Sequence, residues 1–545
     1  MHLRFLLLFP IAVVLPAAAQ PAPEPADSAA VAFLKAEATD RGAVMDHARW
    51  LTDVHGPRLT GSPQLEAAQR WAAERFRSWG LTADLEPWGL FGRGWSVDRF
   101  ALNARVAGPD VAPQTFALTA VPKAWSPSTG RVTAPVVVID RDDEDALDAY
   151  RGQLADRIVL LTGEPEEVAV GFEPIASRRD AEALLALANA GSPDATSRRY
   201  SRERIERYLA QQRRLAALFA EAPLAILEPS GLGGTGSIRV AAAATPLPEG
   251  GSYQDRPDPW VEGVEAVPQF VVMTEHYNRL LRLVEAGQEV TLDLDFEAQW
   301  YDDDPVEHNV IAEIPGTDLG EEIVLVGAHV DSWHGGTGAT DNASGSAVVM
   351  EAARLLDAFF DATGTQPRRT LRFALWSGEE QGLYGSRAYV NEHIAASSGY
   401  GATPTALRPD HDRYSAYYNL DNGTGRIRGV YLQGNAEVGP IFRAWLTAFA
   451  DSTAQTLSLG NTGGTDHVPF DAAGIPGFQF IQDPVAYFGQ TWHGSLDTYD
   501  HLVEDDLEQA AALIATFAYH TAMRDEKLPR KPLVLAPADQ AAGTN

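Results

Sequence analysis

The spacing of apolar residues divides the chain into three parts with different predicted structure. Apolar residues in Val44–Val54 and Gln64–Trp79 recur at a helical period, so residues 29–80 are predicted to be helical. From about residue 291 onward, short apolar runs alternate with amphipathic stretches, as strands and helices alternate in an α/β sheet. Between these parts, residues 113–290 contain short strand-like runs and one long Arg- and Ala-rich helix.

The C-terminal part gives the most regular pattern. Its apolar and aromatic runs predict strands at 309–314, 323–328, 370–376, 416–420, 429–433 and 477–481. Its amphipathic stretches predict helices at 345–360, 436–450 and 505–523. We therefore expect an α/β fold. The residues before this part, 81–112, contain what we interpret as short strand-like pieces.

The first residues match an export signal. One positive charge in Met1–Arg4 precedes the apolar run Phe5–Leu15 and the small residues Ala17–Ala19. This pattern predicts a signal peptide at residues 1–19, because the apolar run is too short to span a membrane. Residues 20–28 follow as a Pro-rich linker. We expect a secreted or periplasmic protein with no membrane span; an N-terminal core helix is the alternative.

Composition narrows the function classes. A chain of 545 residues is too long for one compact core, which favours two domains or a domain with a large insertion. With 43 basic and 74 acidic residues, the net charge of −31 argues against nucleic-acid binding. The absence of cysteine excludes disulfides, thiolate metal sites and a cysteine nucleophile. Histidine and carboxylate chemistry remains.

Three common site motifs are missing, and a fourth fails on context. The sequence contains no P-loop, no H-E-x-x-H and no G-x-S-x-G. Gly231–Gly236 matches G-x-G-x-x-G, but the residues after it are predicted to be extended, whereas a dinucleotide site needs a helix there. A glycine-rich hairpin is the simpler interpretation.

Histidine and acidic residues follow successive predicted strands. They are His329 and Asp331 after strand 323–328, Glu379 and Glu380 after 370–376, Asp421 after 416–420, and His493 after 477–481. Asp341 lies in the loop between His329 and the next helix. Because ligands bind at the carboxyl ends of strands in open α/β sheets, the topology gathers these residues at one edge. Two histidines with several carboxylates predict a divalent metal site.

The segments around these residues resemble the co-catalytic dizinc exopeptidases, of the leucyl aminopeptidase and glutamate carboxypeptidase type. The matching segments are GPRLTGS at 56–62, VGAHVDS at 326–332, GATDNASG at 338–345, WSGEEQG at 376–382, NLD at 419–421, GTDH at 464–467 and WHGSLD at 492–497. The layout is most similar to the carboxypeptidase Q branch, in which a protease-associated domain is inserted. The resemblance implies a mixed, mostly parallel sheet flanked by helices, with a β-rich insertion.

The resemblance also implies roles for single residues. Two Zn²⁺ ions per chain would share Asp341, with His329 and Asp421 at one ion and Glu380 and His493 at the other. Glu379 would be the general base, and Asp331 would hydrogen-bond His329. Tyr487 or His467 would be the donor to the oxyanion, and the sequence leaves this choice open. A cis peptide bond would join Asp341 to Asn342.

The implied domains are an N-terminal part of the peptidase domain at 29–112, the insertion at 113–290, the catalytic domain at 291–525 and a tail at 526–545. We expect the insertion to shape access and to supply no imidazole ligand, because it lacks histidine between Leu102 and Thr274. A spacer or partner-binding module is the alternative.

The expected function is a zinc exopeptidase that acts on dipeptides or on the N-terminal residues of short peptides. The alternatives are a carboxypeptidase-type enzyme, an inactive receptor-like binding protein, and a glutaminyl-cyclase-like acyltransferase. The expected partners are short peptide substrates, without nucleic acid or membrane. The sequence is compatible with a homodimer and does not decide the oligomeric state.

Overall fold

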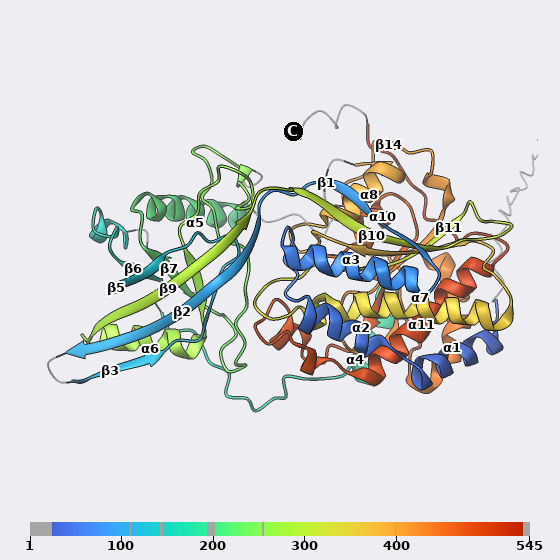
Figure 1. Ribbon diagram of the computed structural model, residues 1–545, viewed down its shortest axis with the longest axis horizontal. Coiled ribbons are helices and arrows are strands. Elements are labelled where there is room, and N and C mark those ends of the chain that lie inside the picture. Colours follow the sequence, from blue (N-terminus) through green and yellow to red (C-terminus); the bar gives the residue numbers. More distant parts are fainter. Residues whose placement is uncertain are drawn as a thin grey trace, which may run out of the picture.

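Two bodies lie side by side in the computed structural model, and each contains an eight-stranded sheet (Figure 1). The structure describes residues 24–537, apart from 109–110, 142, 144, 163, 193–201, 253–254, 398 and 400. The predicted signal peptide at 1–19 lies outside the described residues, as do residues 20–23 of the predicted linker and 538–545 of the predicted tail.

The first sheet has the strand order β1-β10-β12-β11-β15-β18-β16-β17. Its strands are β1 (Thr82–Leu90), β10 (Val306–Ile314), β11 (Ile323–His329), β12 (Thr370–Trp376), β15 (Tyr414–Asn419), β16 (Ile427–Tyr431), β17 (Thr456–Ser458) and β18 (Gly477–Gln482). The central strands β12, β11, β15 and β18 run parallel. The pairs β1–β10, β10–β12 and β16–β18 are antiparallel, and β16 and β17 are parallel. The predicted α/β class with a mixed sheet is confirmed.

Helices cover both faces of this sheet. On one face lie α1 (Ser28–Asp40), α2 (Val44–Arg49), α3 (Pro63–Ser78), α7 (Ser344–Thr363), α9 (Gly439–Leu446) and α11 (Glu504–Met523). On the other lie α8 (Tyr384–His393) and α10 (His467–Ala472). The residues of β11 alternate between the two cores: Val324 and Val326 pack on the first face, and Leu325 packs on the second. Burial on both faces explains why this strand is a continuous apolar run.

The second sheet has the order β3-β2-β9-β5-β6-β7-β8-β4. Its strands are β2 (Gly94–Gly108), β3 (Val111–Ala117), β4 (Ala120–Pro122), β5 (Gly130–Ile139), β6 (Ile158–Leu161), β7 (Ala225–Pro229), β8 (Gln269–Val272) and β9 (Glu289–Tyr301). The helices α5 (Arg202–Ala220) and α6 (Thr274–Glu285) belong to the same body (Figure 1). The sheet thus includes strands on both sides of the range 113–290, and the domain limits themselves stay a prediction.

The expectation of short strand-like pieces before residue 113 is wrong, because β2 is a 15-residue strand. It pairs antiparallel with β9 along its length. Leu102, Ala104 and Val106 are buried on one face. On the other face Arg105 forms an ion pair with Asp293 of β9. Charged residues interrupt the apolar run, so a search for continuous apolar residues misses this strand. The alternation of charged and apolar residues with a period of two is nevertheless typical of a half-buried strand.

One segment of the second body extends onto the first. It carries α4 (Ala181–Ala188), which contacts β17 (Figure 1). The Ser177 backbone N–H donates to the Val485 carbonyl oxygen at 2.8 Å. The Arg178 guanidinium lies 2.9 Å from Asp483 and 2.7 Å from Asp506, two carboxylates with no exposed surface. Arg426 and Arg428 pair with the same two carboxylates. Because a buried carboxylate that loses a cationic partner is costly, these ion pairs favour the position of the segment against the first body.

The start of the C-terminal tail is also held against the first body. Leu528 is buried, and the Lys531 ammonium donates to the Gln433 carbonyl oxygen at 2.7 Å. Among the helices that the structure describes, none is long and apolar enough to cross a membrane.

His334 lies where the two bodies meet. Its Nε2 is 2.8 Å from the Pro122 carbonyl oxygen, and its ring meets the Trp95 indole edge-on with centroids 5.1 Å apart. Burial lowers its pKa to about 4, so it is a neutral contact between the bodies.

This environment predicts a pH-dependent stability. An unfolded imidazole titrates near pH 6.5, so the free energy of unfolding should fall as the pH drops from about 6.5 to about 4, by at most about 3 kcal/mol for this residue. His334→Gln retains a donor for Pro122 and should reduce this loss. Urea unfolding of both proteins at pH 7 and pH 4.5 measures the difference. An equal acid-induced loss in both proteins would contradict the assignment.

Candidate metal centre

The predicted ligands lie at one edge of the first sheet. His329 ends β11, Glu380 follows β12 after a short turn, and Asp421 follows β15. These three strands are adjacent and parallel, so their carboxyl ends meet. Asp341 comes from the turn Ala339–Ala343 that precedes α7, and His493 follows the turn Tyr487–Thr491.

The five side chains form two groups that share Asp341. His329 Nε2 lies 3.3 Å from Asp341 Oδ1 and 3.4 Å from Asp421 Oδ1. His493 Nε2 lies 3.4 Å from Asp341 Oδ2 and 2.9 Å from Glu380 Oε2. Each oxygen of Asp341 therefore faces a different histidine. One carboxylate between two donor groups is the arrangement expected of a bridging ligand.

Several atoms at this centre are buried without a hydrogen-bond partner. Within the described residues these atoms are His329 Nε2, Asp341 Oδ2, Glu380 Oε1 and Asp421 Oδ1. Unpartnered buried polar atoms are rare and costly in folded proteins. Imidazole and carboxylate are the ligand types that zinc accepts. The residues therefore fit a metal cation.

The electrostatics agree with this fit. Burial opposes a charge on the His329 imidazole, but the carboxylates of Asp421 and Glu379 outweigh this effect and raise the pKa of His329 well above its usual range. Burial, together with the charge of Asp341, raises the pKa of Glu380 well above its ordinary value. Several buried carboxylates close together are thus unfavourable in their ionised form without a counter-charge, and a divalent cation would supply that charge.

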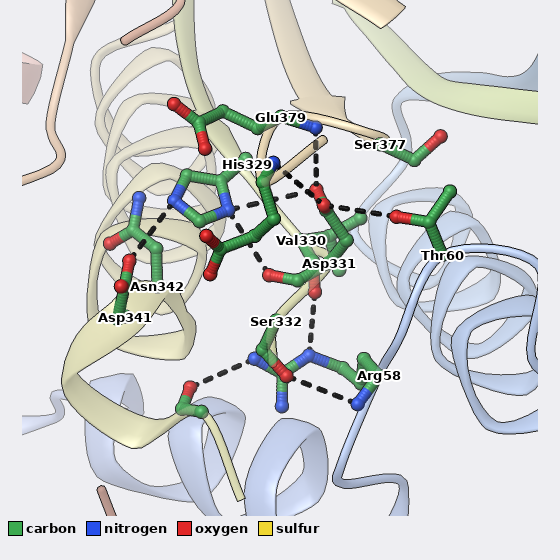
Figure 2. Close-up of polar contacts among 12 residues, drawn as sticks. Arg58, Thr60, His329, Val330, Asp331, Ser332, Asp341, Asn342, Ser377 and Glu379 are labelled. Atoms are coloured by element: carbon green, nitrogen blue, oxygen red, sulfur yellow. Dashed lines mark hydrogen bonds and ion pairs between the residues drawn. The ribbon is translucent and has the colours of Figure 1, made fainter. Parts of the chain in front are cut away.

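Asp331 connects the histidine to the pair of glutamates (Figure 2). Its carboxylate accepts hydrogen bonds from the backbone N–H groups of Glu379 at 3.3 Å and Glu380 at 3.2 Å. The Thr60 hydroxyl donates to it at 3.1 Å. His329 Nδ1 lies 3.1 Å from the Asp331 carbonyl oxygen and 3.6 Å from its carboxylate. Bonds of this kind fix the tautomer and ring orientation of a metal-binding histidine.

Arg58 holds the loop that contains these residues (Figure 2). It is fully buried, and its guanidinium donates to the carbonyl oxygens of Val330 at 2.6 Å, Thr337 at 2.8 Å and Gly338 at 2.9 Å. In the sequence, Arg58 stands out only as part of the segment 56–62. A buried arginine has no local signature, so its role emerges only from the folded chain.

Asp497 fixes the turn that presents Asp341. Its carboxylate accepts from the backbone N–H of Thr340 at 2.6 Å and of Asp341 at 3.1 Å. The peptide bond between Asp341 and Asn342 is cis, as the resemblance implied. The Asn342 amide donates to the Leu420 carbonyl oxygen at 2.9 Å, next to Asp421. Asp497 ends the segment 492–497, and the sequence alone predicts no role for it.

Glu379 lies beside the first donor group. One ligand atom each of Glu379, His329 and Asp421 lies within 4.8 Å of the others, as do those of His329, Asp341 and Glu380. Burial and the neighbouring carboxylate of Asp421 raise the pKa of Glu379 well above its ordinary value. Distance alone therefore permits Glu379 to bind a metal or to move a proton.

Tyr487 and His467 both lie near the centre. Tyr487 is 5% exposed, and burial raises its pKa well above 10, with the charges of Asp341 and Asp421 acting in the same direction. His467 is fully buried, and its Nε2 lies 3.1 Å from the Thr462 carbonyl oxygen. The charges of ligands from both groups therefore act on the Tyr487 hydroxyl. One ring nitrogen of His467, by contrast, contacts the Thr462 carbonyl oxygen and not the centre.

The second body contacts the loop that contains His493. The Val240 backbone N–H donates to the His493 carbonyl oxygen at 2.8 Å, and that of Ser495 donates to Ile238 at 2.9 Å. The indole of Trp492 stacks on the His493 ring with centroids 3.9 Å apart. The Trp333 indole also faces the His493 ring. Trp333 and His493 line a small hollow together with Asp341 and Glu380.

Residues 309–518 match the family model of peptidase family M28. Carboxypeptidase Q of Mus musculus is 31% identical over 269 residues, which are 49% of this chain and 53% of that protein. Aminopeptidase YwaD of Bacillus subtilis is 33% identical over 215 residues, which are 38% of this chain and 43% of that protein. The chain spans about half the length of the curated relatives it matches.

Solved structures extend the likeness to most of the chain. A peptidase M28 precursor from Shewanella amazonensis SB2B is similar with a TM-score of 0.63 and 23% identity, covering 93% of this chain and 99% of that one. A zinc aminopeptidase from Bacillus subtilis is similar with a TM-score of 0.51 and 19% identity, covering 88% and 95%. At these identities the likeness shows the fold.

Proposed function

We propose, from the membership of residues 309–518 in peptidase family M28, that the protein is a zinc-dependent exopeptidase. Its substrates would be dipeptides or the N-terminal residues of short peptides. The observation that carries this proposal is the pair of donor groups that share Asp341, whose two oxygens face His329 and His493 at 3.3 and 3.4 Å.

We assign two zinc ions to these groups. His329, Asp421 and Asp341 would hold one ion, and His493, Glu380 and Asp341 would hold the other. The unpartnered buried atoms of His329, Asp341, Glu380 and Asp421 support this assignment. When bound, zinc supplies a Lewis acid for the scissile carbonyl and for the attacking water.

The chain itself would supply the proton transfers. Glu379 would take the proton of the attacking water and deliver it to the leaving amine. A glutamate whose pKa is raised by burial is suited to this exchange near neutral pH. Asp331 would hold Glu379 through its backbone N–H and keep His329 oriented. The Tyr487 hydroxyl would donate to the developing oxyanion, which its proximity to both groups favours over His467.

The second body would form a wall beside the centre. Its segment Ser237–Val240 pairs with the loop at His493, and this contact supports a wall within reach of the substrate. A wall at this position would exclude folded proteins and favour short peptides. The insertion limits of 113–290 belong to this proposal. So does secretion or periplasmic location, which rests on the apolar leader at residues 1–19.

Two alternative functions can be distinguished from this one by experiment. A carboxypeptidase-type enzyme would use the same centre on the other end of the peptide. An inactive binding protein would have lost donor atoms, and the complete set of five donors disfavours it.

Hydrolysis of matched peptides tests the proposal. Zinc-loaded protein should release the N-terminal residue from a tripeptide with a free amine, and chelation should abolish this release. The N-acetylated tripeptide should resist, since its first residue is blocked. Release of the C-terminal residue from the N-acetylated form would establish the carboxypeptidase alternative. No hydrolysis of the tripeptide, of its N-acetylated form or of a free dipeptide by the zinc-loaded protein would favour the binding-protein alternative.

A further inference from the structure

Arg239 belongs to the second body but lies at the rim of the metal centre. It forms a β-bridge with Gly494, the residue after His493. Its guanidinium lies over the Trp492 indole, 5.0 Å from the ring centroid, and that indole stacks on the His493 ring. One aromatic ring therefore separates this cation from a predicted zinc ligand.

The guanidinium of Arg239 is only partly satisfied. Its Nη2 donates to the Phe488 carbonyl oxygen at 3.2 Å, and its Nε is buried without a partner among the described residues. No carboxylate in the described part of the chain forms an ion pair with it. Arg58, by contrast, uses its guanidinium on backbone carbonyl oxygens beneath the centre and is out of reach of a ligand. Arg239 is thus a cation with free hydrogen-bonding capacity.

The charge of the surroundings gives this cation a use. Two zinc ions would balance the charges of the carboxylates of Asp341, Glu380, Asp421 and Glu379, so these groups together leave no net positive charge to attract an anionic substrate. Arg239 adds a positive charge at one side, beside His493. A planar guanidinium pairs with a carboxylate through two parallel hydrogen bonds, which the half-occupied fork of Arg239 can offer.

We propose that Arg239 binds the α-carboxylate of the substrate and selects peptides whose leaving residue is the C-terminal one, that is, dipeptides. This inference rests on the proposed peptidase function. One extended residue spans about 3.3–3.6 Å, so a carboxylate one residue beyond the scissile bond reaches the rim of the centre. In longer peptides the carboxylate would lie beyond Arg239.

The test compares one dipeptide with its C-terminal amide, using wild-type protein, Arg239→Met and Arg239→Lys. Arg279→Met is the matched control, because Arg279 lies over the Phe116 ring at 3.6 Å in the same body, on the α6 side of the second sheet. Zinc content is measured in every variant and should not change. Because Arg239 does not touch the predicted ligands, the protein should fold with both metals bound.

In Arg239→Met, kcat/KM for the free dipeptide should fall roughly 10–100-fold, mainly through KM, because a charge-assisted hydrogen bond is lost. The amide should be hydrolysed equally by wild type and Arg239→Met. Arg239→Lys should recover part of the loss, and Arg279→Met should match wild type. Equal losses on both substrates, or no loss on either, would overturn the proposal.

Measurements of ligand binding distinguish a failure of this inference from a failure of the proposed function. If the zinc-loaded wild type hydrolyses neither substrate, the peptidase proposal fails, and calorimetry of dipeptide and amide binding still decides the role of Arg239. Tighter binding of the free dipeptide that disappears in Arg239→Met supports the carboxylate site. Equal affinity of wild type for the two compounds contradicts it.

Discussion

Replacing Glu379 with glutamine should lower kcat by about 10²–10⁴-fold while the zinc content stays unchanged. The amide is nearly isosteric with the carboxylate but cannot accept a proton from the attacking water. The backbone N–H of Glu379 that donates to Asp331 is retained, so the turn after β12 should keep its shape. Steady-state kinetics and elemental analysis of the same preparation measure both effects.

The adjacent residue provides the control. Glu380→Gln removes a donor that lies 2.9 Å from His493 Nε2, so this variant should lose zinc instead. If Glu379→Gln loses zinc to the same extent, Glu379 is a ligand, as its distance to His329 and Asp421 also permits. A kcat near that of wild type would show that another group is the base.

Replacing Asp341 with asparagine should have the largest effect on metal binding. Each of its oxygens faces a different histidine, so the variant should bind neither zinc ion tightly and should lose nearly all activity. Asp421→Asn is the matched variant, because Asp421 lies only beside His329. It should retain one ion, at the group of His493 and Glu380.

Zinc titration of the two variants distinguishes a shared ligand from two separate ones. Loss of a single ion in Asp341→Asn, equal to that in Asp421→Asn, would contradict the bridging role. Thermal unfolding of both variants without zinc is the control for folding, since both substitutions preserve side-chain volume.

The catalytic sheet and its donor residues could be predicted from the sequence because their signals are local. Strand β11 is an apolar run buried on both faces, and His329 stands at its end. The rule that ligands lie at the carboxyl ends of parallel strands then placed Glu380 and Asp421 beside it. Asp341 was predicted from its loop between His329 and the next helix, and His493 from its position after the predicted strand 477–481. The family resemblance supplied the sharing of Asp341 between two ions.

The residues that hold these donors could not be found in this way. Arg58 lies far from the centre in sequence, and only the folded chain brings its guanidinium to the carbonyl groups of residues 330–338. Asp497 accepts from the backbone of Thr340 and Asp341, a contact across more than 150 positions. Arg239 comes from the predicted insertion, which was expected to supply no imidazole ligand because it lacks histidine between Leu102 and Thr274. Such contacts depend on tertiary structure, not on local pattern.

The measurement that tests the central claim most directly is the zinc content of the purified wild-type chain, freed of metal by chelation and then titrated with zinc. Two ions should bind per chain, and peptidase activity should return with them. Binding of no zinc, or full activity in the chelated protein, would contradict it.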